Sequence, residues 1–73
     1  MDAQILEVTL KTHIAEMRKR LDQAAGIAKA AEACAEAGNV EKAIQIALDV
    51  EQLIYEVNTM LNAASLMNRI YKT

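Results

Sequence analysis

The strongest turn signal in the chain is the pair Gly38–Asn39, near the middle of 73 residues that include no proline. Glycine adopts the left-handed conformation that ends many helices, and an asparagine side chain can cap the helix that follows. Segments with helical periodicity lie on both sides of this pair. We therefore predict an all-α fold, a long antiparallel helical hairpin. The expected organisation is one domain over residues 1–73, with a helix at 2–37, a turn at 38–39 and a helix at 40–72.

Apolar residues in both arms recur at alternating intervals of four and three, the heptad pattern of coiled coils. In the first arm this seam is Leu10, Ile14, Met17, Leu21, Ala24, Ala28, Ala31 and Ala35, widened by Leu6 and Ile27. In the second arm it is Ala43, Ala47, Val50, Ile54, Val57, Leu61 and Ala64, beside a parallel row of Ile46, Leu53, Met60 and Met67. Folding the chain at the turn sets seam against seam, with Leu21 opposite Val57.

The composition indicates that the hairpin does not complete its own core. Apolar residues make up 53% of the chain, but the aromatic residues are two tyrosines and much of the seam is alanine. Two helices cannot enclose a core, and helices with wide apolar faces are typical of four-helix bundles. We therefore predict that two hairpins dimerise into an antiparallel four-helix bundle. The predicted interface residues are Leu6, Leu10, Ile14, Met17, Leu53, Val57, Met60, Leu61, Ala64 and Met67.

Local signals agree with two helices. Asp2 is placed to cap the first helix. Opposite charges four residues apart favour an exposed helical surface, and they occur in the pairs Glu7–Lys11, Glu16–Arg20 and Arg18–Asp22. Gly26 lies inside the first arm, where glycine costs about 1 kcal/mol relative to alanine. A break at Gly26, which would give three helices, is the alternative at this point.

The residues that carry chemistry are too few and too scattered for an enzyme. His13 is the single histidine and Cys34 the single cysteine, about 30 Å apart along one helix at 1.5 Å per residue. Glu16 lies three residues after His13, but this is the reverse of the order in di-iron bundles and occurs once. We predict no catalytic residues, no metal and no cofactor. His13 is expected to be a contact residue and Cys34 a small apolar one.

The charge pattern leaves two alternatives to protein binding. The net charge of −2 does not favour nucleic acid, although Lys11, Arg18, Lys19 and Arg20 form a local basic cluster among acids. The longest stretch without charge, 57–68, is too short to span a bilayer. A helix lying on a membrane surface through 57–71 is the weaker alternative. The first residues lack the pattern of a signal peptide, and we expect a cytoplasmic protein.

Residues 30–44, with the sequence AAEACAEAGNVEKAI, resemble the helix–turn–helix junction of tetratricopeptide repeats. The resemblance implies the local turn geometry. The rest of the chain departs from that family, because there is no second copy at a 34-residue period and the arms are about twice too long. The overall plan is similar in shape to Rop-type hairpins, which dimerise into four-helix bundles, and to the hairpin chaperones of type III secretion.

Taken together, these features predict a protein that works by contact. We expect a non-catalytic protein–protein interaction module, a self-assembling scaffold, adaptor or small chaperone. Its partner would be a second copy or another helical protein. The alternative is a Rop-like bundle that binds nucleic acid through the basic cluster.

Overall fold

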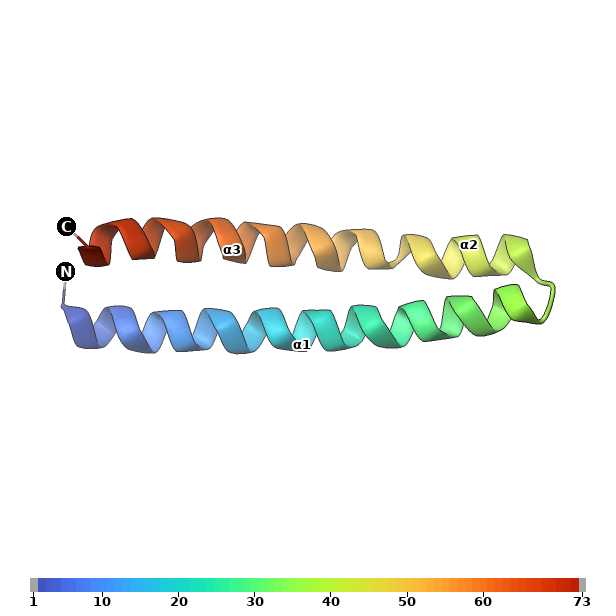
Figure 1. Ribbon diagram of the computed structural model, residues 1–73, viewed down its shortest axis with the longest axis horizontal. Helices are drawn as coiled ribbons and strands as arrows, with labels where there is room; N and C mark the ends of the chain where they lie inside the picture. Colours follow the sequence, from blue (N-terminus) through green and yellow to red (C-terminus); the bar gives the residue numbers. More distant parts are fainter. Residues whose placement is uncertain (1, 73) are drawn as a thin grey trace.

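A computed structural model describes residues 2–72 as a hairpin of two long arms (Figure 1). The first arm is helix α1 (Ala3–Glu36), and the second consists of α2 (Val40–Leu48) and α3 (Val50–Lys72). The molecule is 54 Å long, close to the length of a helix with the 34 residues of α1. The start of α1 and the end of α3 lie side by side. The predicted all-α hairpin is confirmed.

The turn has the geometry that its two residues predict. Gly38 has φ +89°, in the left-handed region. Its N–H donates to the Ala35 carbonyl at 3.0 Å, and the Asn39 N–H donates to the Cys34 carbonyl at 2.9 Å. These two bonds form a Schellman motif, which satisfies carbonyls at the end of α1. The Asn39 side chain then accepts from the Lys42 N–H at 3.2 Å and caps α2.

The cap predicted at the beginning of the first arm is also present. The Asp2 carboxylate accepts from the Gln4 N–H at 2.8 Å. This bond satisfies one of the N–H groups that have no partner within the first turn of a helix.

The second arm is not the single helix that we predicted, because it is interrupted at Asp49. The Asp49 N–H donates to the Ile46 carbonyl, three residues back, at 3.0 Å. Aspartate is a weak helix former in a helix interior. The interruption leaves α2 and α3 nearly in line (Figure 1), and the seven-residue spacing continues across it from Ala43 to Val50.

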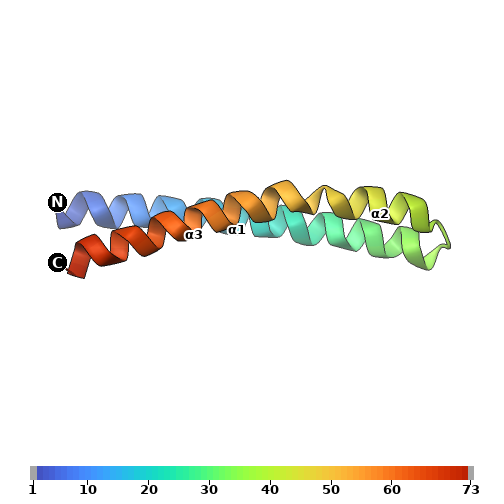
Figure 2. The ribbon, with the colours of Figure 1, turned by 90° about the horizontal axis from the view of Figure 1, so that it is seen from above.

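No break occurs at Gly26, so the three-helix alternative based on that residue is wrong. Helix α1 continues through Gly26 to Glu36. Seen from above, the two arms cross at a shallow angle (Figure 2). Such crossing is expected of helices whose apolar residues repeat every 3.5 residues on average.

The arms pack through a different pair of rows from the one that we predicted. In α1 the row Leu10, Met17, Ala24 and Ala31 faces the second arm, as expected. Its neighbour in the seam is an inner row of Leu6, His13, Arg20, Ile27 and Cys34. The residues that the prediction paired with it, Ile14, Leu21, Ala28 and Ala35, are exposed. The prediction followed the more continuous apolar row, whereas the hairpin buries the row that contains His13 and Arg20.

The second arm shows the same displacement by one row. The row Ala43, Val50, Val57 and Ala64 faces α1, together with an inner row of Ile46, Leu53, Met60 and Met67. The core that results is thin. Only Leu6, Ala24, Ala31 and Ala43 are buried among the residues that the structure describes, and none of them is large and fully enclosed.

Replacing Gly26 with alanine should raise the free energy of unfolding by about 1 kcal/mol, because alanine loses less conformational entropy in a helix. A Cβ built at Gly26 meets no atom within 4 Å, so no steric cost offsets this gain. The same change at Gly38 should lower stability by about 1 kcal/mol because its φ is positive. Urea denaturation followed by circular dichroism, at one protein concentration, measures both. A destabilised Gly26→Ala variant would contradict the continuous helix.

Candidate protein interaction face

One row of each arm lies outside the contact between the arms and is apolar. The outer row of α1 is Ile14, Leu21, Ala28 and Ala35, and the outer row of the second arm is Val40, Ala47, Ile54 and Leu61. Their four largest side chains at the middle of the molecule are exposed to 54% (Ile14), 46% (Leu21), 48% (Ile54) and 53% (Leu61). Each outer row adjoins a half-buried apolar row of its own helix.

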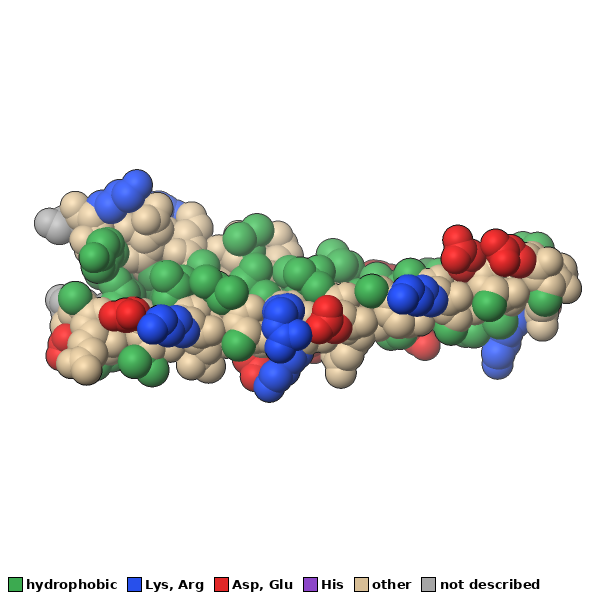
Figure 3. Space-filling model, turned by 60° about the horizontal axis from the view of Figure 1, so that its bottom comes forward, with side chains coloured by type: hydrophobic (Ala, Val, Ile, Leu, Met, Phe, Trp, Pro, Cys, Tyr) green, Lys and Arg blue, Asp and Glu red, His purple; other side chains and the backbone are tan. Residues whose placement is uncertain are grey.

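The two outer rows lie on the same side of the hairpin. A seven-residue step back from Ile14 reaches Glu7, and a step forward from Leu61 reaches Asn68. Both Glu7 and Asn68 line one pocket between α1 and α3. Residues seven apart lie on nearly the same side of a helix in a coiled coil. The outer rows therefore form one surface, which we name the apolar face. Figure 3 shows apolar side chains gathered in a band between the arms.

The opposite side of the hairpin is polar at its middle. Gln23 and Asp49 line a shallow groove there, and the other lining residues are Gly26, Ile27, Ala30, Ile46 and Leu53. One seven-residue step from Gln23 and Asp49 lie Glu16 and Glu56. The hairpin thus has polar side chains at the middle of one side and uncovered aliphatic side chains on the other.

Arg20 joins the two arms on the polar side. Its Nε donates to the Glu56 carboxylate at 3.1 Å, and its Nη1 donates to the Glu16 carboxylate at 2.8 Å. The arginine side chain is partly buried in the seam. Position 20 therefore lies at the level of position 56 along the hairpin. This confirms the predicted register, in which Leu21 lies at the level of Val57. The ion pair with Glu16 was predicted, but the link to Glu56 was not.

The Arg20 cluster shifts two ionisation equilibria. The pKa of Glu16 is lowered, chiefly by the hydrogen bond from Arg20 and then by that from Lys19. The pKa of Arg20 is raised, chiefly by its hydrogen bond to Glu16 and then by that to Glu56. Both shifts favour the charged forms of Glu16 and Arg20.

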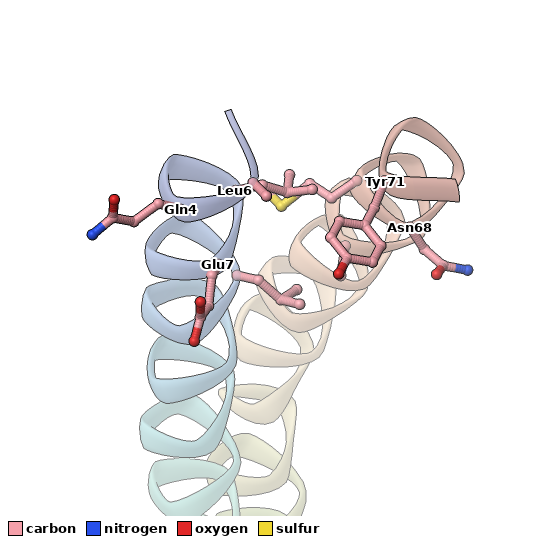
Figure 4. A pocket seen from close by; sticks show the side chains of 9 residues that line it. Gln4, Leu6, Glu7, Asn68 and Tyr71 are labelled. Atoms are coloured by element: carbon pink, nitrogen blue, oxygen red, sulfur yellow. The ribbon is translucent and has the colours of Figure 1, made fainter. Parts of the chain in front are cut away.

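At the open end of the hairpin a pocket of about 370 Å3 separates α1 from α3. Leu6 and Tyr71 reach toward each other across it, while Gln4 and Asn68 point outward (Figure 4). Leu10, Ala64 and Met67 also line it. The pocket opens on the side of Glu7 and Asn68, and so continues the apolar face to the end of the molecule.

The ten predicted interface residues divide into two groups. Leu6 is buried between the arms, and seven more are half-buried there: Leu10, Met17, Leu53, Val57, Met60, Ala64 and Met67. Ile14 and Leu61 are instead on the apolar face. Leu21 and Ile54 share that face and were missing from the predicted set. Their place in the seven-residue rows was the signal that would have found them.

The structure offers little for other kinds of site. His13 and Cys34 are half-buried in the inner row of α1, and Cys34 is a free thiol. Residues 2–72 contain no group of three or more side chains that could hold a metal ion. Within the same residues, no helix has both the length and the hydropathy needed to cross a membrane.

Every base of the predicted nucleic-acid cluster is engaged by an acid. Lys11 pairs with Glu7 at 3.0 Å and Arg18 pairs with Asp22 at 2.9 Å. Lys19 lies 3.4 Å from Glu16, the acid that also accepts from Arg20. The cluster is therefore neutralised locally rather than presented as a positive surface.

Comparisons of the chain with known protein families, with curated proteins and with solved structures give no match.

Replacing Glu16 with glutamine should make the melting temperature less dependent on acid pH. The lowered pKa of Glu16 means that its charged form stabilises the fold above its ordinary pKa of 4.5. That stabilisation is lost as the pH falls through the lowered value. We expect the native chain to melt above the variant at neutral pH, with the difference shrinking as the pH falls below 4.5.

Asp22→Asn is the matched control, because it removes an exposed pair with Arg18 that contributes little. A native-minus-variant difference for Glu16→Gln that stays constant from neutral to acid pH would contradict the role given to this carboxylate.

Proposed function

We propose that this chain is a non-catalytic protein–protein interaction module: a self-assembling helical hairpin that serves as a scaffold, adaptor or small chaperone. The observation that carries the proposal is the apolar face. Monomeric proteins rarely leave large contiguous apolar surfaces in water, and such surfaces mark interaction sites.

The arrangement of the rows supports helices as the covering elements. In each arm one row lies between the inner row and the outer row and belongs to two seams. In α1 this shared row contains Leu10, Met17, Ala24 and Ala31. The hairpin uses the seam with the inner row, and the seam with the outer row is left uncovered. Ile14, Met17 and Leu21 in α1 show the alternating spacing of the second seam. A heptad seam packs against one helix. Two such seams on one side therefore fit two helices.

A second hairpin supplies two helices already joined. Packed face to face, two copies would form an antiparallel four-helix bundle, with the shared rows and outer rows inside. Burying a leucine or isoleucine completely contributes about 1.5–3 kcal/mol. Ile14, Leu21, Ile54 and Leu61 are each about half exposed, and a dimer would cover eight such side chains.

Leu61→Glu should convert the dimer into a monomer with weak helicity, because a carboxylate on the apolar face cannot be buried without a partner. Leu48→Glu is the matched control: Leu48 is 60% exposed in the same arm but lies outside the outer rows. Light scattering on a sizing column gives the mass, and circular dichroism on the peak gives the helicity. We expect twice the chain mass for the native protein and for Leu48→Glu.

A native protein with the mass of one chain would contradict self-assembly. If this monomer also had weak helicity and melted without cooperativity, the result would favour a different protein as the partner of the apolar face, as in a chaperone or adaptor. Unchanged mass and melting temperature for Leu61→Glu would contradict the use of this face.

Binding to RNA or DNA at low salt tests the Rop-like alternative. We expect no binding, because the four bases at positions 11, 18, 19 and 20 are paired with acids. Salt-dependent binding that is lost in Arg18→Ala would overturn this expectation and favour nucleic acid.

A further inference from the structure

We infer that the two copies pack head to tail, so that the turn of one hairpin covers the open-end pocket of the other. This inference rests on the proposed dimer and adds its symmetry. Two hairpins joined on their apolar faces have two symmetric choices: turn beside turn, or turn beside open end. The distribution of large and small side chains distinguishes the two.

The second seam of α1 divides into a large half and a small half. Toward the open end it contains Leu10, Ile14, Met17 and Leu21, and toward the turn it contains Ala24, Ala28, Ala31 and Ala35. In a head-to-tail dimer α1 packs against α1 of the second copy in the reverse direction. With the two-fold axis between Leu21 and Ala24, every large residue faces an alanine: Leu10 with Ala35, Ile14 with Ala31, Met17 with Ala28 and Leu21 with Ala24.

The same two-fold axis also sets the packing of the second arm against its copy. The Arg20–Glu56 ion pair sets the register between the arms, and it places the point between Leu21 and Ala24 beside Ile54. Reversing α3 about that point brings Val50 against Val57 of the other copy and Ala47 close to its Leu61. The same axis sets Ala43 against Ala64 and Ile54 against Ile54 of the other copy, so the complementarity of large and small residues lies in α1.

The turn-to-turn arrangement is less complementary. There α1 would pack against the second arm of the other copy. Ile14 beside Ala64 and Ala24 beside Ile54 would combine large with small residues, but Met17 would lie beside Leu61 and Ala31 beside Ala47. The separation of two packed helices depends on the side chains between them. A large pair at one level and an alanine pair at another require different separations, and unfilled space destabilises a core.

The head-to-tail arrangement also supplies an occupant for the open-end pocket. The axis places Ala35 of one copy over Leu10 of the other, and Val40 over Asn68, so the turn lies on the pocket. Val40 is 59% exposed and begins the outer row of the second arm. Its side chain would cover the apolar lining beside Leu6 and Tyr71.

The distance between the two turns tests the inference. A spin label at Ala37→Cys, in a Cys34→Ala background, reports it by pulsed electron resonance on the full chain. Head-to-tail packing places the labels about 45 Å apart along the bundle, at 1.5 Å per residue on each side of the axis. Turn-to-turn packing places them within about 30 Å, since packed helices lie 8–10 Å apart.

The measurement distinguishes failure of the head-to-tail symmetry from failure of the proposed function. A short distance with twice the chain mass would overturn the symmetry and leave the proposed function in place. A single-chain mass with no intermolecular distance would overturn both.

A disulfide provides the second test. Val40→Cys combined with Asn68→Cys, again with Cys34→Ala, should give a covalent dimer on oxidation. Within one chain these two positions lie at opposite ends of an arm, about 40 Å apart, so the bond must join two copies. Each single cysteine variant is the control and should stay unlinked. A double variant that also stays unlinked on a non-reducing gel would contradict the seating of the turn on the pocket.

Discussion

The structure depends on one row of side chains in each arm that belongs to two seams. In α1 this row is Leu10, Met17, Ala24 and Ala31, and in the second arm it is Ala43, Val50, Val57 and Ala64. Because the row has an apolar neighbour on both sides, each helix can be covered from two directions. The hairpin satisfies one direction with its own second arm. The other direction is what makes the isolated hairpin incomplete.

Arg20 links the two arms in the seam that the hairpin uses. It occupies an inner-row position where an aliphatic residue would be ordinary, and its guanidinium lies between Glu16 and Glu56. A charged side chain of this length can pack its stem against the seam and keep its head near water and carboxylates. On the apolar face the same group would have no such acids. The ion pairs thus give the two arms a preferred rotation as well as a register.

Much of the fold was predictable because its signals are local. Gly38, Asn39 and Asp2 act through hydrogen bonds to their immediate neighbours, and each behaves as predicted. The choice of row was not predictable in this way. Periodicity shows that Leu21 and Ile27 are both on apolar stripes, but it does not say which stripe meets the second arm. That choice depends on contacts between the arms, such as the one between Arg20 and Glu56, which are 36 residues apart. The interruption at Asp49 was missed because the apolar spacing continues through it.

The interruption at Asp49 gives the hairpin two regions of different resistance to local opening. Helix α2 has nine residues and packs against the alanine-rich part of α1, so it buries little area per turn. Its hydrogen-bond ladder is separate from that of α3. Opening that starts at the turn can therefore stop at Asp49 without unwinding the 23 residues of α3. In amide hydrogen exchange we therefore expect the turn end to open as one cooperative unit and the open end as another.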